Sequence, residues 1–536
     1  MSDTRNQTSL QDRLDTLFAP WNRSDTPGLV LGVALEGRTI YRRAFGMASL
    51  ETRAANTVAT RMRIGSTGKH FTALLLLLLA EEGLMALDEP IRRYIPELTG
   101  PGGDPTLRQL MRHRGGSRCY VDLGFLTSGL KPRAPGFALA TQCRQRGRNF
   151  APGSAMIYNN GGYHLLSIAA ERVAGRPFEQ LLAERLFQPL GMAATASIPS
   201  DYAITPGIAT FHVPSGAGGW RRGLFPSLEI KGEGAIVSTV DDMLRWARHL
   251  RQQDTVGSPD SWRQLYTPEA GVDPALGAYA LGIRLEHYRG RRTIGHTGGV
   301  IGGSCDLLCL PEEQLEVVLL VNGAPGVTPE LTRRAVDIVL GERLGGVEPR
   351  PAAADHSSWL GTWWSPDTGM VYGLVDDAGE LKLEVCAQMP RMALKTTRDG
   401  VVLLPEANLG EIRFSGNTDS QSLSIAFGGE SHDYVRIDPS AVDRERFDRD
   451  FAGRYACPDA NATAEIVPSE AGLSMRLRDG FAESVGPVDP LGQDVAELGR
   501  DSEAYGCVID LLRRDGAVVG FRLNSGRTRQ LEFHKL

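Results

Sequence analysis

The sequence predicts an α+β protein in which an antiparallel sheet flanked by helices is followed by two small antiparallel β-barrel domains. Up to about residue 345, segments with the alternating pattern of strands are mixed with segments whose apolar residues recur at helical spacing. Beyond that point the helical periodicity nearly vanishes, and short alternating segments separated by Gly, Asp and Asn continue to the last residue. The expected boundaries are 1–345 for the first domain, 346–357 for a linker, 358–442 for the first barrel and 449–536 for the second.

Length and composition narrow the class of protein. A chain of 536 residues is too long for one core and suggests about three domains. The net charge of −6 argues against a nucleic-acid partner. The leucine run 74–79 is too short to span a membrane, and the N-terminal residues lack the apolar core of a signal peptide, so we expect no membrane partner and a cytoplasmic location. Seven scattered cysteines favour free thiols, and no clustered ligand residues call for a metal or another cofactor.

The elements of the first domain follow from periodicity and turn residues. Strands are expected at 28–36, 38–45, 305–310 and 315–321. Helices are expected at 66–84, 163–173, 241–250 and 329–344. Residues 101–152 are rich in Gly, Arg and Pro, which predicts an irregular, loop-heavy lobe.

The C-terminal part repeats a short pattern. Leu360-Gly361-Thr362-Trp363 is echoed by Ala452-Gly453-Arg454-Tyr455, and each is followed by a similar length of strand-like sequence. A glycine at such a start relieves crowding where a barrel strand bends sharply. We therefore expect two related barrels, divided near the charged stretch 443–450.

Ser66 and Lys69 are the candidate nucleophile and base. Their spacing at the start of a leucine-rich helix places hydroxyl and amine on one face, and burial together with the helix dipole disfavours the charged amine. A neutral amine can take the serine proton. The alternative is a helix-capping serine with a solvated lysine in the next turn. Ser128 and Lys131 have the same spacing, but the Pro132 that follows assigns them to a surface loop.

Acyl transfer also needs a group that protonates the leaving amine, groups that hold the substrate and an oxyanion hole, and two further motifs can supply them. Tyr158 and Asn160 stand on a loop that leads into a helix, where a phenol can return a proton and an amide can hold a substrate carbonyl. A strand carrying His296, Thr297, Gly298 and Gly299 can dock the substrate backbone along its edge, with the Gly299 N–H completing an oxyanion hole. The alternative is a core tyrosine and a turn asparagine.

The three motifs in this order resemble the serine β-lactamase and penicillin-binding protein superfamily, over roughly residues 20–345. The resemblance is to the branch that holds class C β-lactamases, DD-carboxypeptidases, related esterases and D-aminopeptidases. It implies Ser66, Lys69 and Tyr158 as catalytic residues and Asn160 and 296–299 as substrate-binding residues.

His296 stands where better known members of the superfamily carry lysine. Histidine is largely uncharged near neutral pH, which weakens the readings as a β-lactamase or a carboxypeptidase. Histidine followed by two barrels is similar to the bacterial D-aminopeptidases. That similarity implies a homodimeric serine hydrolase that releases N-terminal D-amino acids, D-alanine above all, from peptides and amides through an acyl-enzyme. The alternatives are a DD-carboxypeptidase, esterase or β-lactamase-like hydrolase of the same fold, and an idle binding protein, which should have lost one of the motifs.

The resemblance also implies that the last domain sends a loop to the active site. A substrate with a free ammonium needs a carboxylate or carbonyl acceptor, and Asp479 and Glu483 are candidates unless they only solubilise a hairpin. They lie in a segment expected to interrupt the strands of the second barrel. This candidate specificity loop comprises Arg478, Asp479, Gly480, Phe481, Ala482, Glu483, Ser484, Val485, Gly486 and Pro487.

Overall fold

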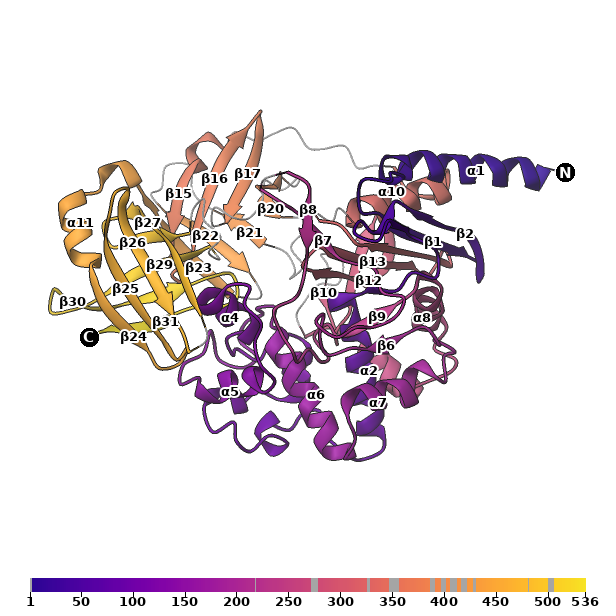
Figure 1. Cartoon of the computed structure of the whole chain (residues 1–536), viewed down its shortest axis with the longest axis horizontal. Helices are drawn as coiled ribbons and strands as arrows, with labels where there is room; N and C mark the ends of the chain where they lie inside the picture. The colour runs from indigo at the N-terminus through magenta and orange to yellow at the C-terminus, as the bar shows by residue number, and fades with distance from the viewer. Residues whose placement is uncertain are drawn as a thin grey trace. The chain divides into compact units, whose positions relative to one another are not determined.

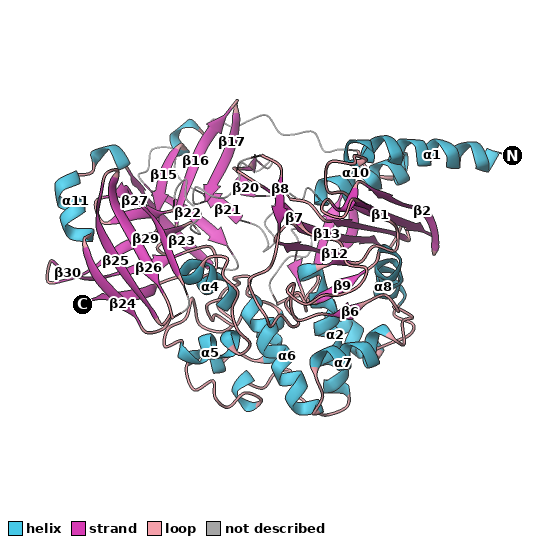
Figure 2. Cartoon of the chain, in the orientation of Figure 1, coloured by secondary structure: helices cyan, strands magenta, loops and turns pink. Residues whose placement is uncertain are grey.

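The computed structural model places most of the chain in two compact units (Figure 1; Figure 2). The first comprises Met1–Glu89 and Tyr163–Glu348, and the second Pro90–Gly162 and Pro349–Leu536. The structure describes residues 2–216, 218–270, 278–324, 328–346, 356–385, 391–396, 402–404, 412–415, 422–427, 430–480, 482–499 and 506–536. The predicted linker 346–357 lies largely outside these ranges, so the domain boundaries stay predictions.

The first unit is built on a seven-stranded antiparallel sheet with the order β10-β11-β12-β13-β14-β1-β2. The predicted strand pairs at both ends of this part of the sequence are confirmed. The strands are β1 Leu29–Leu35, β2 Arg38–Phe45, β10 Ala278–Tyr279, β11 Arg284–Tyr288, β12 Arg291–Val300, β13 Gly303–Leu310 and β14 Leu315–Val321. Shorter strands are β3 Met47–Ser49, β4 Ala54–Ala55, β5 Met62–Arg63, β6 Ala196–Ser197, β7 His212–Pro214, β8 Trp220–Arg222 and β9 Ile236–Ser238.

Helices cover both faces of this sheet. α1 (Ser2–Phe18) and α10 (Thr328–Leu340) lie together on one face, where their leucines share one core with β1, β2 and β14 (Figure 1). α8 (Val240–Gln252) covers the other face, so close that a side chain at Gly32 of β1 would meet Val240. Thr239 caps α8 by accepting a hydrogen bond from the Asp242 N–H.

The predicted leucine-rich helix is α2 (Lys69–Glu81), preceded by a 3-10 turn at Gly65–Gly68. All of its leucines except Leu78 are buried, which makes it a core helix of the first unit. The remaining helices of this unit are α6 Asn160–Ala174, which starts in the second unit, α7 Phe178–Leu182 and α9 Pro259–Leu265. Within the described residues, no helix is long and apolar enough to cross a membrane.

The second unit contains two antiparallel β structures, and the predicted fold class is confirmed. The C-terminal one is a closed eight-stranded barrel. Its strands are β24 Gly453–Cys457, β25 Ala462–Ser469, β26 Gly472–Arg478, β27 Glu483–Gly492, β28 Val495–Leu498, β29 Cys507–Arg514, β30 Ala517–Asn524 and β31 Leu531–Lys535. α11 (Arg444–Phe451) precedes it, at the charged stretch where the division was expected.

The other β structure is a nine-stranded sheet that runs from β18 to β19 as its two end strands. These end strands are separated in the sequence by Leu394 alone, so the sheet curls back towards itself as a half-barrel. The strands are β15 Gly361–Trp364, β16 Val371–Asp377, β17 Glu380–Val385, β18 Met392–Ala393, β19 Lys395–Thr396, β20 Val402–Leu404, β21 Ile412–Ser415, β22 Ser422–Phe427 and β23 Glu430–Ile437. Both β15 and β24 start at the glycine of the repeated pattern, and both glycines have a positive φ.

Residues 90–162 of the second unit are less irregular than predicted. They contain α3 (Leu107–Met111), α4 (Tyr120–Ser128) and α5 (Phe137–Arg144). α4 lies beside the closed barrel (Figure 1), and its Leu123 and Leu126 are buried in the same core cluster as the barrel interior. Ser128, which was assigned to a surface loop, is instead the buried last residue of α4.

The candidate specificity loop is mostly strand, which corrects the prediction. Arg478 ends β26, Glu483 begins β27, and the two residues pair across a tight turn. Residues 483–487 all belong to β27, and Phe481 lies outside the described residues. Gly486 and Pro487 suggested a loop, but both keep register with β26, because a barrel strand accepts proline where no ladder N–H is required.

Candidate active site

Ser66 and Lys69 form the centre of the candidate site in the first unit. Ser66 is half-buried in the 3-10 turn, and Lys69, the first residue of α2, is completely buried. Lys69 Nζ donates a hydrogen bond of 2.9 Å to Ser66 Oγ. This places the amine where it can exchange a proton with the hydroxyl, and the alternative of a solvated lysine is wrong.

Strand β12 runs directly beside the turn that carries Ser66. A side chain at Gly298 would lie 1.8 Å from the Ile64 carbonyl oxygen, so this contact requires glycine. Gly65 has a φ of +54°, and a side chain there would meet Gly299 O at 2.9 Å. Thr67 Oγ1 also donates to the His296 carbonyl oxygen at 3.1 Å. These contacts fix residues 296–299 against the nucleophile.

Residues 296–300 of β12 extend past the end of its neighbouring strand β11. The ladder between β11 and β12 ends at Gly295, whereas the ladder between β12 and β13 continues to Val300. Gly299 is exposed, and a side chain built on it would meet no atom within 4 Å. Beyond Gly295 the edge of β12 is not paired with β11, and docking of a substrate segment along it stays a prediction.

His296 is buried and neutral. Its side chain is 4% exposed, Nε2 lies 3.0 Å from Tyr279 Oη, and Nδ1 lies 2.5 Å from the Thr297 carbonyl oxygen. Burial, with smaller contributions from His70 and Lys69, lowers the pKa of His296 well below its usual value. The neutral ring donates from Nδ1 and accepts at Nε2 from the Tyr279 hydroxyl, so it supplies no cation.

A buried pair that the sequence analysis missed supports Lys69. Lys69 Nζ donates at 2.8 Å to the carbonyl oxygen of Glu233. The Glu233 side chain is 4% exposed, and its Oε1 lies 2.9 Å from His164 Nδ1 on α6, while Oε2 accepts from the Lys231 N–H at 3.2 Å. These bonds hold the loop whose carbonyl orients the amine. The only signal in the sequence is a carboxylate between Gly232 and Gly234.

Tyr158 and Asn160 lie in the second unit. Asn160 is the first residue of α6, and Tyr158 is 4% exposed with its ring centroid 4.0 Å from that of His113. Asn159, which the motif skips, fixes the turn between them. Its N–H donates to His113 Nδ1 at 3.0 Å, and its Oδ1 accepts from the Gly161 N–H at 2.7 Å, which caps the helix.

The two candidate carboxylates of the barrel hairpin already have partners. Asp479 Oδ2 accepts hydrogen bonds from the hydroxyls of Thr127 and Ser128, and its Oδ1 accepts from the Ala482 N–H. Glu483 pairs with Arg478 and with Arg476, and the hydrogen bond to Arg478 lowers the pKa of its exposed carboxyl. A role for either carboxylate in binding an ammonium stays a prediction.

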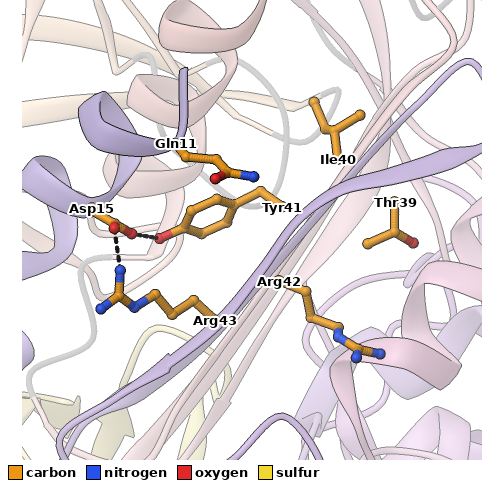
Figure 3. A pocket seen from close by; sticks show the side chains of 7 residues that line it. All are labelled: Gln11, Asp15, Thr39, Ile40, Tyr41, Arg42 and Arg43. Atoms are coloured by element: carbon orange, nitrogen blue, oxygen red, sulfur yellow. Dashed lines mark hydrogen bonds and ion pairs between the residues drawn. The ribbon is translucent and has the colours of Figure 1, made fainter. Parts of the chain in front are cut away.

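Figure 3 shows a pocket of about 510 Å³ elsewhere in the first unit, where α1 meets β2. Asp15 accepts a hydrogen bond from Tyr41 and pairs with Arg43 there, and no predicted site residue lines it. The lining residues are Gln11, Asp15, Thr39, Ile40, Tyr41, Arg42 and Arg43.

Across the described part of the chain, no group of three or more His, Cys, Asp or Glu residues is arranged to hold a metal ion.

Comparisons with known proteins agree with this architecture. A family model described as Beta-lactamase matches residues 13–341. A D-aminopeptidase from Brucella anthropi is 27% identical over 526 residues, covering 95% of each chain. Another D-aminopeptidase from Brucella anthropi is 31% identical over 474 residues, covering 85% of this chain and 83% of its own. The structure of an octameric penicillin-binding protein homologue from Pyrococcus abyssi has a TM-score of 0.56 and 20% identity, covering 80% of this chain and 99% of its own.

A serine that is hydrogen-bonded to a buried lysine, beside the edge of an antiparallel sheet, defines a serine hydrolase of the acyl-transfer type. The chain belongs to the Beta-lactamase family, and relatives that match it over nearly its full length are named D-aminopeptidase.

Proposed function

We propose that this protein is a D-stereospecific aminopeptidase that releases N-terminal D-amino acids, D-alanine above all, from peptides and amides. The observation that carries the proposal is the 2.9 Å hydrogen bond between Lys69 Nζ and Ser66 Oγ, in a chain whose full-length relatives are named D-aminopeptidase. The substrate is a small peptide or amide with a free N-terminal D-residue.

In the proposed reaction, Lys69 as the neutral amine takes the Ser66 proton while Oγ attacks the carbonyl carbon of the first residue. The N–H groups of Ser66 and Gly299 stabilise the oxyanion, and Asn160 holds a substrate carbonyl. The C–N bond then breaks, and Tyr158 delivers a proton to the leaving amine. Water attacks the resulting ester by the reverse transfers, which releases the D-amino acid and restores the Ser66 hydroxyl.

The neutral His296 separates this proposal from its alternatives. A DD-carboxypeptidase or β-lactamase gains from a permanent cation that pairs with the substrate carboxylate. His296 cannot supply it, because burial keeps the imidazole uncharged. An aminopeptidase selects its substrates by the free N-terminal amine and does not need a cation for a substrate carboxylate, so the neutral ring suits it.

The experiment that tests the mechanism removes the two groups in turn. We expect Ser66→Ala to abolish turnover of D-alanine p-nitroanilide, and Lys69→Ala to lower it by at least roughly 10³-fold, because nucleophile and base act as one unit. Lys131→Ala, in the second Ser-x-x-Lys sequence, is the matched control and should keep wild-type activity. Wild-type turnover by Ser66→Ala would rule out the acyl-enzyme.

Two further properties belong to the same proposal. We propose that the enzyme acts in the cytoplasm. We also propose that it is a homodimer, which is what the resemblance implies. Light scattering coupled to size-exclusion chromatography should then give twice the mass of one chain. A monomer or a larger assembly would contradict the dimer while leaving the chemistry unaffected.

A further inference from the structure

Arg527 of the closed barrel lies over the ring of Tyr158. Its guanidinium carbon is 5.0 Å from the centroid of the tyrosine ring. Arg527 belongs to the connection between β30 and β31, residues 525–530, far from Tyr158 in the sequence but in the same compact unit. No motif in the sequence marks it.

The connection that carries Arg527 is held firmly on residues 90–162. The Arg527 carbonyl accepts a hydrogen bond of 3.0 Å from Asn149 Nδ2, and the Arg529 N–H donates to Asn149 Oδ1 at 2.9 Å. Arg118, 3% exposed, donates to the carbonyls of Arg529 and Gln530 at 3.0 and 2.7 Å. The position of Arg527 is therefore built into the packing of this unit.

We propose that Arg527 is a positioning residue for Tyr158, and that its guanidinium stabilises the deprotonated phenol that the reaction requires. The inference rests on the proposed function, because it takes Tyr158 as the group that accepts and returns a proton. The closed barrel would then contribute directly to the acid–base chemistry through one of its connections.

The electrostatic environment of Tyr158 within this unit supports the assignment. A cation within about 4–6 Å favours the charged form of an acid by roughly 1–3 pKa units, and arginine stays protonated at every pH of interest. His113 also packs on the ring, and because its Nδ1 accepts the Asn159 N–H, that nitrogen carries no proton in this arrangement. Arg527 supplies a permanent charge that His113 does not.

The test compares full-length Arg527→Gln and Arg527→Lys, with Arg444→Gln as the matched control. Arg444 also lies over an aromatic ring of this unit, with its guanidinium carbon 5.4 Å from the Phe447 centroid, but Phe447 has no part in the reaction. In the pH profile of kcat/KM for D-alanine p-nitroanilide, Arg527→Gln should move the limb assigned to Tyr158 up by roughly one unit or more. Arg527→Lys should move it less, and Arg444→Gln not at all.

A second readout does not depend on turnover. The ultraviolet absorbance of tyrosinate, taken as the difference between each protein and its Tyr158→Phe counterpart, reports the ionisation of Tyr158 itself. Its midpoint should be higher in Arg527→Gln than in the wild type, and Arg527→Met serves if the glutamine variant does not fold. Equal midpoints, or a loss of rate with an unmoved limb, would overturn the role of Arg527. If the midpoint of Arg527→Gln is higher than that of the wild type but the wild type does not cleave the D-amide, the proposed function is refuted and the role of Arg527 is not.

Discussion

His296 and Asp306 show how burial sets the charge of single residues on neighbouring strands of the sheet. The His296 ring packs against His70 of α2, and the Asp306 carboxylate accepts a hydrogen bond from Thr332 of α10. Burial lowers the pKa of His296 and raises the pKa of Asp306 to about 6. Both side chains are therefore held towards their uncharged forms.

Asp306 makes the stability of the first unit depend on pH. An aspartate in the unfolded chain has a pKa near 3.9, so between about pH 4 and 6 the folded state holds more protons than the unfolded state. The free energy of unfolding therefore falls as the pH rises through this window. Asp306→Asn removes the titrating group. We expect the free energy of unfolding of this variant, relative to that of the wild type, to be about 2 kcal/mol higher at pH 8 than at pH 4. Urea unfolding at the two pH values measures this, and a pH-independent difference would contradict it.

The sequence predicts site residues that are close together along the chain, but it does not predict those that only packing brings together. Ser66 and Lys69 are three positions apart at the start of a helix, so their contact follows from local geometry. Glu233 and His164 are 69 positions apart, and Arg527 meets Tyr158 across two separate segments of its unit. No periodicity encodes such contacts, because they depend on how whole elements pack.

Among the elements, β12 and the 3-10 turn before α2 depend on each other for position. Gly298→Ala would place a methyl group 1.8 Å from Ile64 O, which forces the strand away from Ser66. We expect a loss of about 1–3 kcal/mol in stability and of roughly 100-fold in kcat. Gly299→Ala is the matched control, since its methyl group meets no atom within 4 Å, and it should keep the wild-type melting temperature. Equal melting temperatures for the two variants would show that the contact does not constrain the strand.

Strands with clear alternation were located from the sequence, whereas the hairpin of β26 and β27 was not. Residues 483–487 alternate weakly, and Gly486-Pro487 suggested a loop. In the barrel, Pro487 pairs with Ser474 and Gly486 with Met475, so tertiary pairing overrides the local preference. Boundaries of this kind depend on the neighbouring strand, which the sequence of one strand does not reveal.

At the scale of the whole molecule, residues 90–162 depend on the C-terminal part of the chain. Leu123 and Leu126 are buried in the core of the closed barrel, and the buried Arg118 pairs with Asp459 at 3.1 Å. Deleting all residues after Gly345 would expose these leucines and leave the arginine without its carboxylate. We expect residues 90–162 to lose their protection from hydrogen exchange in the truncated chain. Protection equal to that in the full-length protein would contradict this dependence.

Sequence order alone suggested a first domain continuous from residue 1 to 345. That boundary stays a prediction, but residues 90–162 belong to the same compact unit as Pro349–Leu536, and α4 packs into the barrel core. α4 is buried on almost every side and its sequence has no distinct apolar face, so the sequence does not show which element covers its leucines. The predicted fold class is correct, while this long-range packing needed coordinates.

The measurement that tests the central claim most directly compares kcat/KM for D-alanine and L-alanine p-nitroanilide, with the N-acetylated D-compound and a chromogenic cephalosporin in parallel. A D-stereospecific aminopeptidase should prefer the D-amide over its enantiomer by roughly 100-fold or more, because only one stereoisomer aligns its carbonyl with Ser66 Oγ. It should lose activity when the amine is acetylated, since the ammonium then no longer forms. Equal rates for the enantiomers, or faster turnover of the N-acetyl compound or the cephalosporin, would contradict the account.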